Sequence, residues 1–220
     1  MWVKICGNTN LEDAQLAAKL GADALGFVFA ESKRQVTPQQ VAAITPHLPG
    51  AVERVGVFSS RDVHEITAIV REASLNAVQL HGGLDTELIA RLFEQLGSDV
   101  GLIQTLHWTV GHDTSTSLAM DLRKIVGTGT VKRVLVDSRV GQVSGGTGVA
   151  FDWRAARTVL DQYAKELKVI VAGGLRPENV AEAIQQLRPW GVDVVSGVEV
   201  SPGQKDPAKL AEFLRIAKET

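Results

Sequence analysis

Apolar runs of strand length alternate with segments of helical spacing, and this alternation constrains the fold more than any other feature. We expect eight strands: Trp2–Cys6, Ala24–Phe29, Arg54–Phe58, Ala77–His81, Gly101–Leu106, Val131–Asp137, Lys168–Ala172 and Val192–Ser196. Between them apolar residues recur every three or four positions, as in the segment 88–96. A chain that alternates strands with helices is predicted to form a parallel sheet covered by helices.

Eight strand–helix units in 220 residues fit a closed (β/α)8 barrel, the TIM barrel, and we expect one α/β domain over residues 1–220. An open doubly wound sheet is the alternative. Such a sheet would carry a G-x-G-x-x-G loop after its first strand, whereas this chain has Cys6–Gly7–Asn8 there. We therefore favour the barrel. The segment His107–Ser117 is polar and resembles a loop, and it receives no assignment.

Three helix starts carry capping signals. Thr9 with Glu12 predicts a capping box before the first helix, and Thr37 with Gln40 predicts a second one around a proline. Asp206–Pro207 combines an N-cap residue with a proline at the first helical position. These signals place helices directly after predicted strand–loop segments.

Composition excludes several classes of protein. The chain has 23 basic and 25 acidic residues, a net charge of −2, so we expect no nucleic-acid partner and no polybasic membrane contact. No apolar run reaches the roughly 20 residues of a membrane helix. The single cysteine excludes an internal disulfide framework and an all-cysteine metal site. We expect a cytoplasmic enzyme or binding domain.

In a barrel of this type the loops after the strands build the functional site, so Cys6 at the end of the first strand is a candidate. Period-two alternation puts Trp2, Lys4 and Cys6 on one face, which points into the barrel if Val3 and Ile5 contact the helices. An inward lysine favours a thiolate, which can act as nucleophile or general base. The alternative is a buried cysteine that behaves as a small hydrophobic residue.

Four other polar residues fall at or near strand ends. Asp137 is either a catalytic acid or base or a cap for the following turn. Arg34 can bind a carboxylate through both arms of its guanidinium or remain a solvated charge. His81 is a possible rim contact, and Asp193, inside the last predicted strand, is expected to be structural or to support a site residue from behind. No companion residues at ligand spacing accompany them, so we expect no metal site.

Glycine clusters follow the last three predicted strands. Gly173 and Gly174 follow the seventh strand, and Ser196 with Gly197 follows the eighth, where backbone N–H groups of this fold often bind phosphate. The alternative is that these glycines only form tight turns. A third cluster, after the sixth strand, is a candidate mobile lid or a simple connector: Gly145, Gly146, Thr147 and Gly148.

These segments together resemble the phosphoribosylanthranilate isomerase family, nearly from end to end. The opening Lys4–Ile5–Cys6–Gly7 with Thr9 to Ala14 is the most specific match. Other matching segments are Gly21–Phe29, Ser32–Arg34, Val55–Phe58, Val78–Gly82, Leu135–Ser138, Gly145–Gly148, Ala172–Leu175, Pro177–Val180 and Val192–Glu199. The chain departs from the usual family pattern at Val149, Val195 and Arg176.

The resemblance implies a cofactor-independent and metal-independent Amadori rearrangement of a small phosphosugar in tryptophan biosynthesis. It gives Cys6 the role of general base and Asp137 that of general acid, with Arg34 holding the carboxylate of the substrate. The segments Gly173–Gly174 and Ser196–Gly197 would hold the phosphate. A monomer and a homodimer are both compatible with the sequence.

Three other functions remain as alternatives. The sugar isomerase of histidine biosynthesis performs the same rearrangement on the same fold, but with an aspartate at the position of Cys6. A metal-dependent sugar-phosphate epimerase would need several His and Asp ligands at strand ends, where only His81 and Asp137 qualify. A barrel that binds phosphosugars without turnover would retain the same loops.

Overall fold

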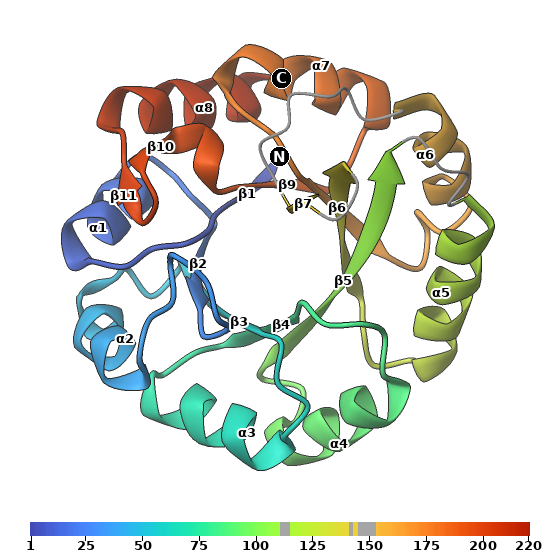
Figure 1. Cartoon of the computed structure of the whole chain (residues 1–220), viewed down its shortest axis with the longest axis horizontal. Helices are drawn as coiled ribbons and strands as arrows, with labels where there is room; N and C mark the ends of the chain where they lie inside the picture. The colour runs from blue at the N-terminus through green and yellow to red at the C-terminus, as the bar shows by residue number, and fades with distance from the viewer. Residues whose placement is uncertain (111–114, 141–142, 145–152) are drawn as a thin grey trace.

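The computed structural model describes residues 1–110, 115–140, 143–144 and 153–220. Parallel strands close into a ring, seen end-on in Figure 1, in the order β5-β4-β3-β2-β1-β9-β8-β6 with β5 paired to β6. The ring strands are β1 (Trp2–Ile5), β2 (Ala24–Val28), β3 (Glu53–Phe58), β4 (Ala77–Leu80), β5 (Gly101–Val110), β6 (Arg133–Val140), β8 (Lys168–Ala172) and β9 (Gly191–Val194). The predicted (β/α)8 barrel is confirmed.

Helices surround the ring on the outside (Figure 1). They are α1 (Leu11–Lys19), α2 (Pro38–Ile44), α3 (Val63–Glu72), α4 (Thr86–Leu96), α5 (Ser115–Thr128), α6 (Trp153–Leu160), α7 (Pro177–Leu187) and α8 (Pro207–Glu219). In the part of the chain that the structure describes, none of these helices has the length and apolar character needed to cross a membrane.

Shorter elements lie between the main ones. Two 3-10 helices are η1 (Thr45–His47) and η2 (Ser196–Val198), and β7 (Val143–Ser144) pairs antiparallel with β6. A hairpin of β10 (Glu199–Ser201) and β11 (Gln204–Lys205) lies between β9 and α8.

The core has two layers. Residues such as Val3 and Ile5 on β1 are fully buried between strands and helices. A second, smaller cluster fills the inside of the ring with Ala24, Val55, Ala77, Ile103, Leu135, Ile170 and Ala172. Small and branched side chains in this position fill the barrel as a packed core, as is usual for the fold.

Aromatic rings close the end of the barrel where the strands begin. The rings of Trp2 and Trp190 stack with centroids 5.0 Å apart, and the guanidinium of Arg133 lies 5.9 Å from the Trp2 ring. Arg133 also forms two hydrogen bonds to Glu53, at 2.6 and 2.7 Å. The opposite end of the ring, where the strands finish, is therefore the end left for a site.

Two predicted helix caps are confirmed and one is wrong. Thr37 forms a capping box with Gln40, and Asp206 accepts hydrogen bonds from the first turn of α8. The first helix is capped by Asn10, whose Oδ1 accepts a hydrogen bond from Asp13 N at 2.8 Å, and the predicted Thr9 cap is wrong. Asparagine is an equally good N-cap, and its extended backbone stands directly before the helix.

Part of the unassigned polar segment is strand. Residues up to Val110 continue β5 because they pair with an extension of β6, in which His107 lies opposite Asp137 and Trp108 opposite Ser138. Residues 115–117 begin α5. The sequence predicts that Asp137 ends its strand. In the structure three more strand residues follow it, so this prediction is wrong. Pairing between strands overrides the polar local sequence here.

Candidate active site

A cavity of about 560 Å³ opens at the end of the barrel where the strands finish. Residues from seven of the eight ring strands or the loops after them line it: Cys6, Val28, Ala30, Glu31, Ser32, Arg34, Val57, Ser59, Gln79, His81, Leu135, Asp137, Ala172, Gly173, Gly174, Leu175, Asp193, Val194, Val195 and Ser196. They include every described site candidate from the sequence except Gly197. The candidate lid of residues 145–148 lies outside the described residues.

Cys6 points into the barrel, as period-two alternation predicts. A Cβ atom at Gly26 on the neighbouring strand β2 would lie 2.5 Å from Cys6 Sγ and 3.0 Å from Lys4 Cε. The absent side chain at Gly26 therefore makes room for both groups inside the ring. Residue Cys6 is only 4% exposed, yet it lines the cavity.

Lys4 and Asp193 form a buried ion pair next to Cys6. Lys4 Nζ donates a hydrogen bond to Asp193 Oδ1 at 2.7 Å, and the two residues face each other in the register of β1 with β9. Asp193 also lines the cavity, so it lies next to a candidate site residue, in line with the second of its two expected roles.

The pKa of Cys6 is shifted upward. Burial raises the pKa of the thiol, and the positive charge of Lys4 lowers it by less. The negative charge of Asp193 adds to the upward shift. Lys4 therefore favours the thiolate, as expected from the sequence, but the effect of burial is larger and the pKa of Cys6 stays raised.

Asp137 lies in the same cavity, beside two histidines. Asp137 Oδ2 is 3.9 Å from His107 Nδ1, and the rings of His107 and His81 meet edge to face with centroids 5.3 Å apart. The sequence predicts His81 as a possible rim contact and assigns no role to His107. The only signal for His107 was its position opposite Asp137, which appears only when β5 and β6 are paired.

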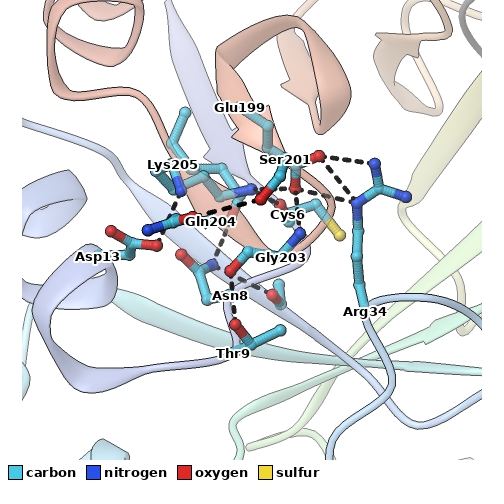
Figure 2. Close-up of polar contacts among 12 residues, drawn as sticks. Cys6, Asn8, Thr9, Asp13, Arg34, Glu199, Ser201, Gly203, Gln204 and Lys205 are labelled. Atoms are coloured by element: carbon cyan, nitrogen blue, oxygen red, sulfur yellow. Dashed lines mark hydrogen bonds and ion pairs between the residues drawn. The ribbon is translucent and has the colours of Figure 1, made fainter.

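Arg34 reaches the cavity while bound to a carboxylate of this chain. Its Nε and Nη2 donate to both oxygens of Glu199 at 2.6 to 3.0 Å (Figure 2). Glu199 also accepts a hydrogen bond from the buried Lys205 Nζ at 3.1 Å. The hydrogen bonds with Glu199 raise the pKa of Arg34. Neither Glu199 nor Lys205 was proposed as a site residue from the sequence.

Gly173 and Gly174 form a turn at the cavity wall that requires glycine. Their φ angles are +92° and +67°, in the region that side-chain-bearing residues rarely adopt. Asn179 holds the turn, because its Nδ2 donates to Gly174 O at 3.0 Å and its Oδ1 accepts from Arg176 N at 2.9 Å. This explains how α7 begins behind Arg176, whose side chain is a poor cap.

Ser196 lines the cavity, and Gly197 follows it in η2. A Cβ atom at Gly197 would overlap the carbonyl oxygen of Leu175. The glycine therefore lets the loop after β9 pack directly against the loop after β8. Among the described residues no group of three or more His, Cys, Asp and Glu side chains is placed to hold a metal ion.

Comparisons with known proteins agree on one family. The family model of N-(5'phosphoribosyl)anthranilate (PRA) isomerase matches residues 3–215. The N-(5'-phosphoribosyl)anthranilate isomerase of Thermotoga neapolitana is 41% identical over 217 residues, which cover 98% of each chain.

Solved structures agree with this match. The phosphoribosyl anthranilate isomerase of Thermotoga maritima has 36% sequence identity and a TM-score of 0.84, with 100% of both chains covered. A second structure is described as this isomerase in complex with reduced 1-(o-carboxyphenylamino)-1-deoxyribulose 5-phosphate, with 35% identity, a TM-score of 0.80 and 100% of both chains covered. The chain belongs to the family of N-(5'-phosphoribosyl)anthranilate isomerases, aldose–ketose isomerases of tryptophan biosynthesis.

Proposed function

We propose that Cys6 is the general base and Asp137 the general acid of this isomerisation. The reaction is an Amadori rearrangement, in which N-(5-phosphoribosyl)anthranilate becomes 1-(2-carboxyphenylamino)-1-deoxyribulose 5-phosphate. The observation that carries the assignment is that the thiol of Cys6, directly after β1, and the carboxyl group of Asp137, on β6, line the same cavity. Two proton transfers at different atoms need two such groups.

The first step opens the sugar ring. Asp137 donates a proton to the furanose ring oxygen, the bond between that oxygen and C1 breaks, and the nitrogen lone pair forms an iminium. Residue Asp137 is 8% exposed, so little bulk water competes for this proton. The nitrogen of the substrate accepts the positive charge, and the step needs no cofactor.

The second step removes the proton from C2. The Cys6 thiolate takes this proton, the C2–H electrons form a double bond to C1, and the iminium nitrogen becomes neutral. The resulting enol then tautomerises to the ketone. A cationic iminium beside Cys6 favours the thiolate, which offsets the upward shift that burial gives to the pKa of this thiol.

The other proposed roles concern binding. We propose that Arg34 binds the anthranilate carboxylate and that the loops at Gly173–Gly174 and Ser196–Gly197 bind the phosphate. Arg34 and the two loops border one cavity, which supports this division. His81 is proposed as a contact at the rim.

We also propose that residues 1–220 act as a single isomerase domain, as a monomer or homodimer in the cytoplasm. Support for one domain comes from α8, where Lys218 Nζ donates to Asp23 Oδ2 at 2.5 Å and to Met1 O at 3.1 Å. These contacts join the last helix to the residues directly before β2 and β1.

Substitution of the two proposed proton-transfer groups tests the assignment. Cys6→Ala and Asp137→Asn are each expected to lower kcat by at least about a hundredfold, within the range of general acid–base contributions. The assay follows the loss of fluorescence as freshly prepared phosphoribosylanthranilate is consumed, with a metal chelator present. Circular dichroism shows whether each variant is folded, and a folded variant with normal turnover removes that residue from its role.

A further inference from the structure

Two cations share one carboxylate beside the cavity. Arg34 and Lys205 both donate to Glu199, whose Oε1 accepts from Lys205 Nζ at 3.1 Å and from Arg34 Nε at 2.9 Å (Figure 2). The side chains of Lys205 and Glu199 are 0% and 3% exposed, whereas that of Arg34 is 22% exposed and lines the cavity. Two positive charges and one negative charge leave this triad with a net charge of +1.

The triad is formed by segments that are distant in the sequence. The β10–β11 hairpin carries Glu199 and Lys205. Thr9 Oγ1, in the loop after β1, donates to Gly203 O at 2.5 Å, and Lys205 N donates to Asp13 Oδ2, in the first turn of α1, at 2.8 Å. Lys205 Nζ also donates to Cys6 O at 2.5 Å. The buried ammonium is thus held at one defined place by two acceptors.

The charges inside the barrel do not cancel this surplus. Lys4 and Asp193 form a pair of their own with no net charge. The raised pKa of Cys6 favours the neutral thiol before substrate binds, so Cys6 does not cancel the surplus either. Glu31 lines the cavity, but it is exposed to solvent, which screens its charge. Burial lowers the pKa of Lys205 overall, and the neighbouring carboxylate of Glu199 opposes this shift. The two oxygen acceptors of Lys205 Nζ, Glu199 Oε1 and Cys6 O, suit a charged ammonium.

Without Lys205, Arg34 would form a closed and neutral pair with Glu199. A bidentate arginine–carboxylate pair is already satisfied in charge and in geometry. A second carboxylate that approached it would meet the negative charge of Glu199 as well as the positive charge of Arg34. Among the described residues no hydrogen bond of Arg34 Nη1 is found, and Arg34 lines the cavity.

We infer that Lys205 is a positioning residue whose charge neutralises Glu199, so that Arg34 can bind the carboxylate of the substrate. Lys205 does not line the cavity, and it acts through Glu199. The inference rests on the proposed role of Arg34. With the substrate carboxylate bound, two cations would face two carboxylates and the site would be balanced in charge.

A charge-balance cycle tests the inference. Lys205→Met removes the surplus charge, so KM for the substrate and the inhibition constant of anthranilate are each expected to rise at least about tenfold. The inhibition constant of inorganic phosphate, which has no carboxylate, is expected to stay within about twofold. Adding Glu199→Gln to Lys205→Met leaves Arg34 as the only charge and restores +1, so KM is expected to fall again.

A purely structural role for Lys205 predicts the opposite result for the double variant. Removing two buried partners would then raise KM at least as much as removing one. A double variant whose KM is equal to or higher than that of Lys205→Met overturns the inference, as does an unchanged inhibition constant of anthranilate in Lys205→Met.

Two further variants keep the result interpretable. Lys205→Gln lacks the charge but keeps a hydrogen-bond donor, so it is expected to raise KM at least about tenfold as well. It replaces Lys205→Met in the test if the methionine variant does not fold. Arg34→Met tests the underlying role: unchanged KM and anthranilate inhibition there would remove Arg34 from the carboxylate site. If Arg34→Met raises KM while Lys205→Gln does not, only the inference about Lys205 fails.

Discussion

Lys4 Nζ lies 2.7 Å from Asp193 Oδ1 inside the barrel, directly beside the only cysteine of the chain. The two charges act on the Cys6 thiol with opposite signs, since Lys4 lowers its pKa and Asp193 raises it. Burial exceeds both and raises the pKa overall. The reactivity of Cys6 is therefore set by a balance that substitution can shift in either direction.

Substitutions in this ion pair are expected to move the titration of Cys6 in opposite directions. Lys4→Met removes the charge that stabilises the thiolate and is expected to raise the pKa of Cys6. Asp193→Asn removes the charge that opposes the thiolate and leaves Lys4 free to stabilise it, so the pKa is expected to fall. The rate of alkylation by iodoacetamide, measured against pH, reports both shifts because Cys6 is the single cysteine. Shifts of the same sign in the two variants would contradict this account.

The pH dependence of turnover is expected to follow the same titration. A general base acts in its deprotonated form, so a raised pKa leaves less thiolate at neutral pH and places the rising limb of kcat/KM in the alkaline range. Asp193→Asn is expected to move this limb to lower pH. Initial rates across a series of buffers measure it. A limb that lies below neutral pH, or that does not move in Asp193→Asn, would show that Cys6 does not control it.

The fold and the two proposed proton-transfer residues could be predicted from the sequence because both depend on local patterns. Strand-length apolar runs are visible one at a time, and a polar residue near the end of such a run falls at the rim of a barrel by topology alone. Cys6 and Asp137 were found in this way, and both line the cavity. Their protonation states and the roles of neighbouring charges depend on burial, which no local pattern records.

The supporting residues could not be predicted, because their partners are far away in the sequence. Arg34 and Glu199 are 165 positions apart, and Lys205 and Cys6 are 199 positions apart. His107 faces Asp137 only because β5 continues beyond the apolar run from which this strand was predicted. Such contacts arise from closure of the ring, where the segment after the last strand meets the loop after the first.

Gly197 is expected to be sensitive to the smallest possible substitution. In Gly197→Ala the new methyl group would overlap backbone atoms of Leu175, which cannot rotate away as a side chain can, so the loops after β8 and β9 must separate. We expect a loss of about 1–3 kcal/mol in the free energy of unfolding and weaker inhibition by inorganic phosphate. Urea denaturation and inhibition assays measure the two effects. Gly50→Ala is the control, because a Cβ there meets no atom within 4 Å.

Arg133, at the opposite end of the barrel, is expected to affect stability without affecting substrate binding. Arg133→Met removes two hydrogen bonds to Glu53 and the contact with the Trp2 ring, and it leaves a partly buried carboxylate without its partner. We expect a loss of about 1–3 kcal/mol in the free energy of unfolding, measured by urea denaturation, with KM unchanged. Arg133→Lys keeps the charge but cannot form the paired hydrogen bonds, so it is expected to fall between the wild type and Arg133→Met. A raised KM in a folded Arg133→Met variant would contradict the separation of the two ends, because nothing at this end lines the cavity where substrate is proposed to bind.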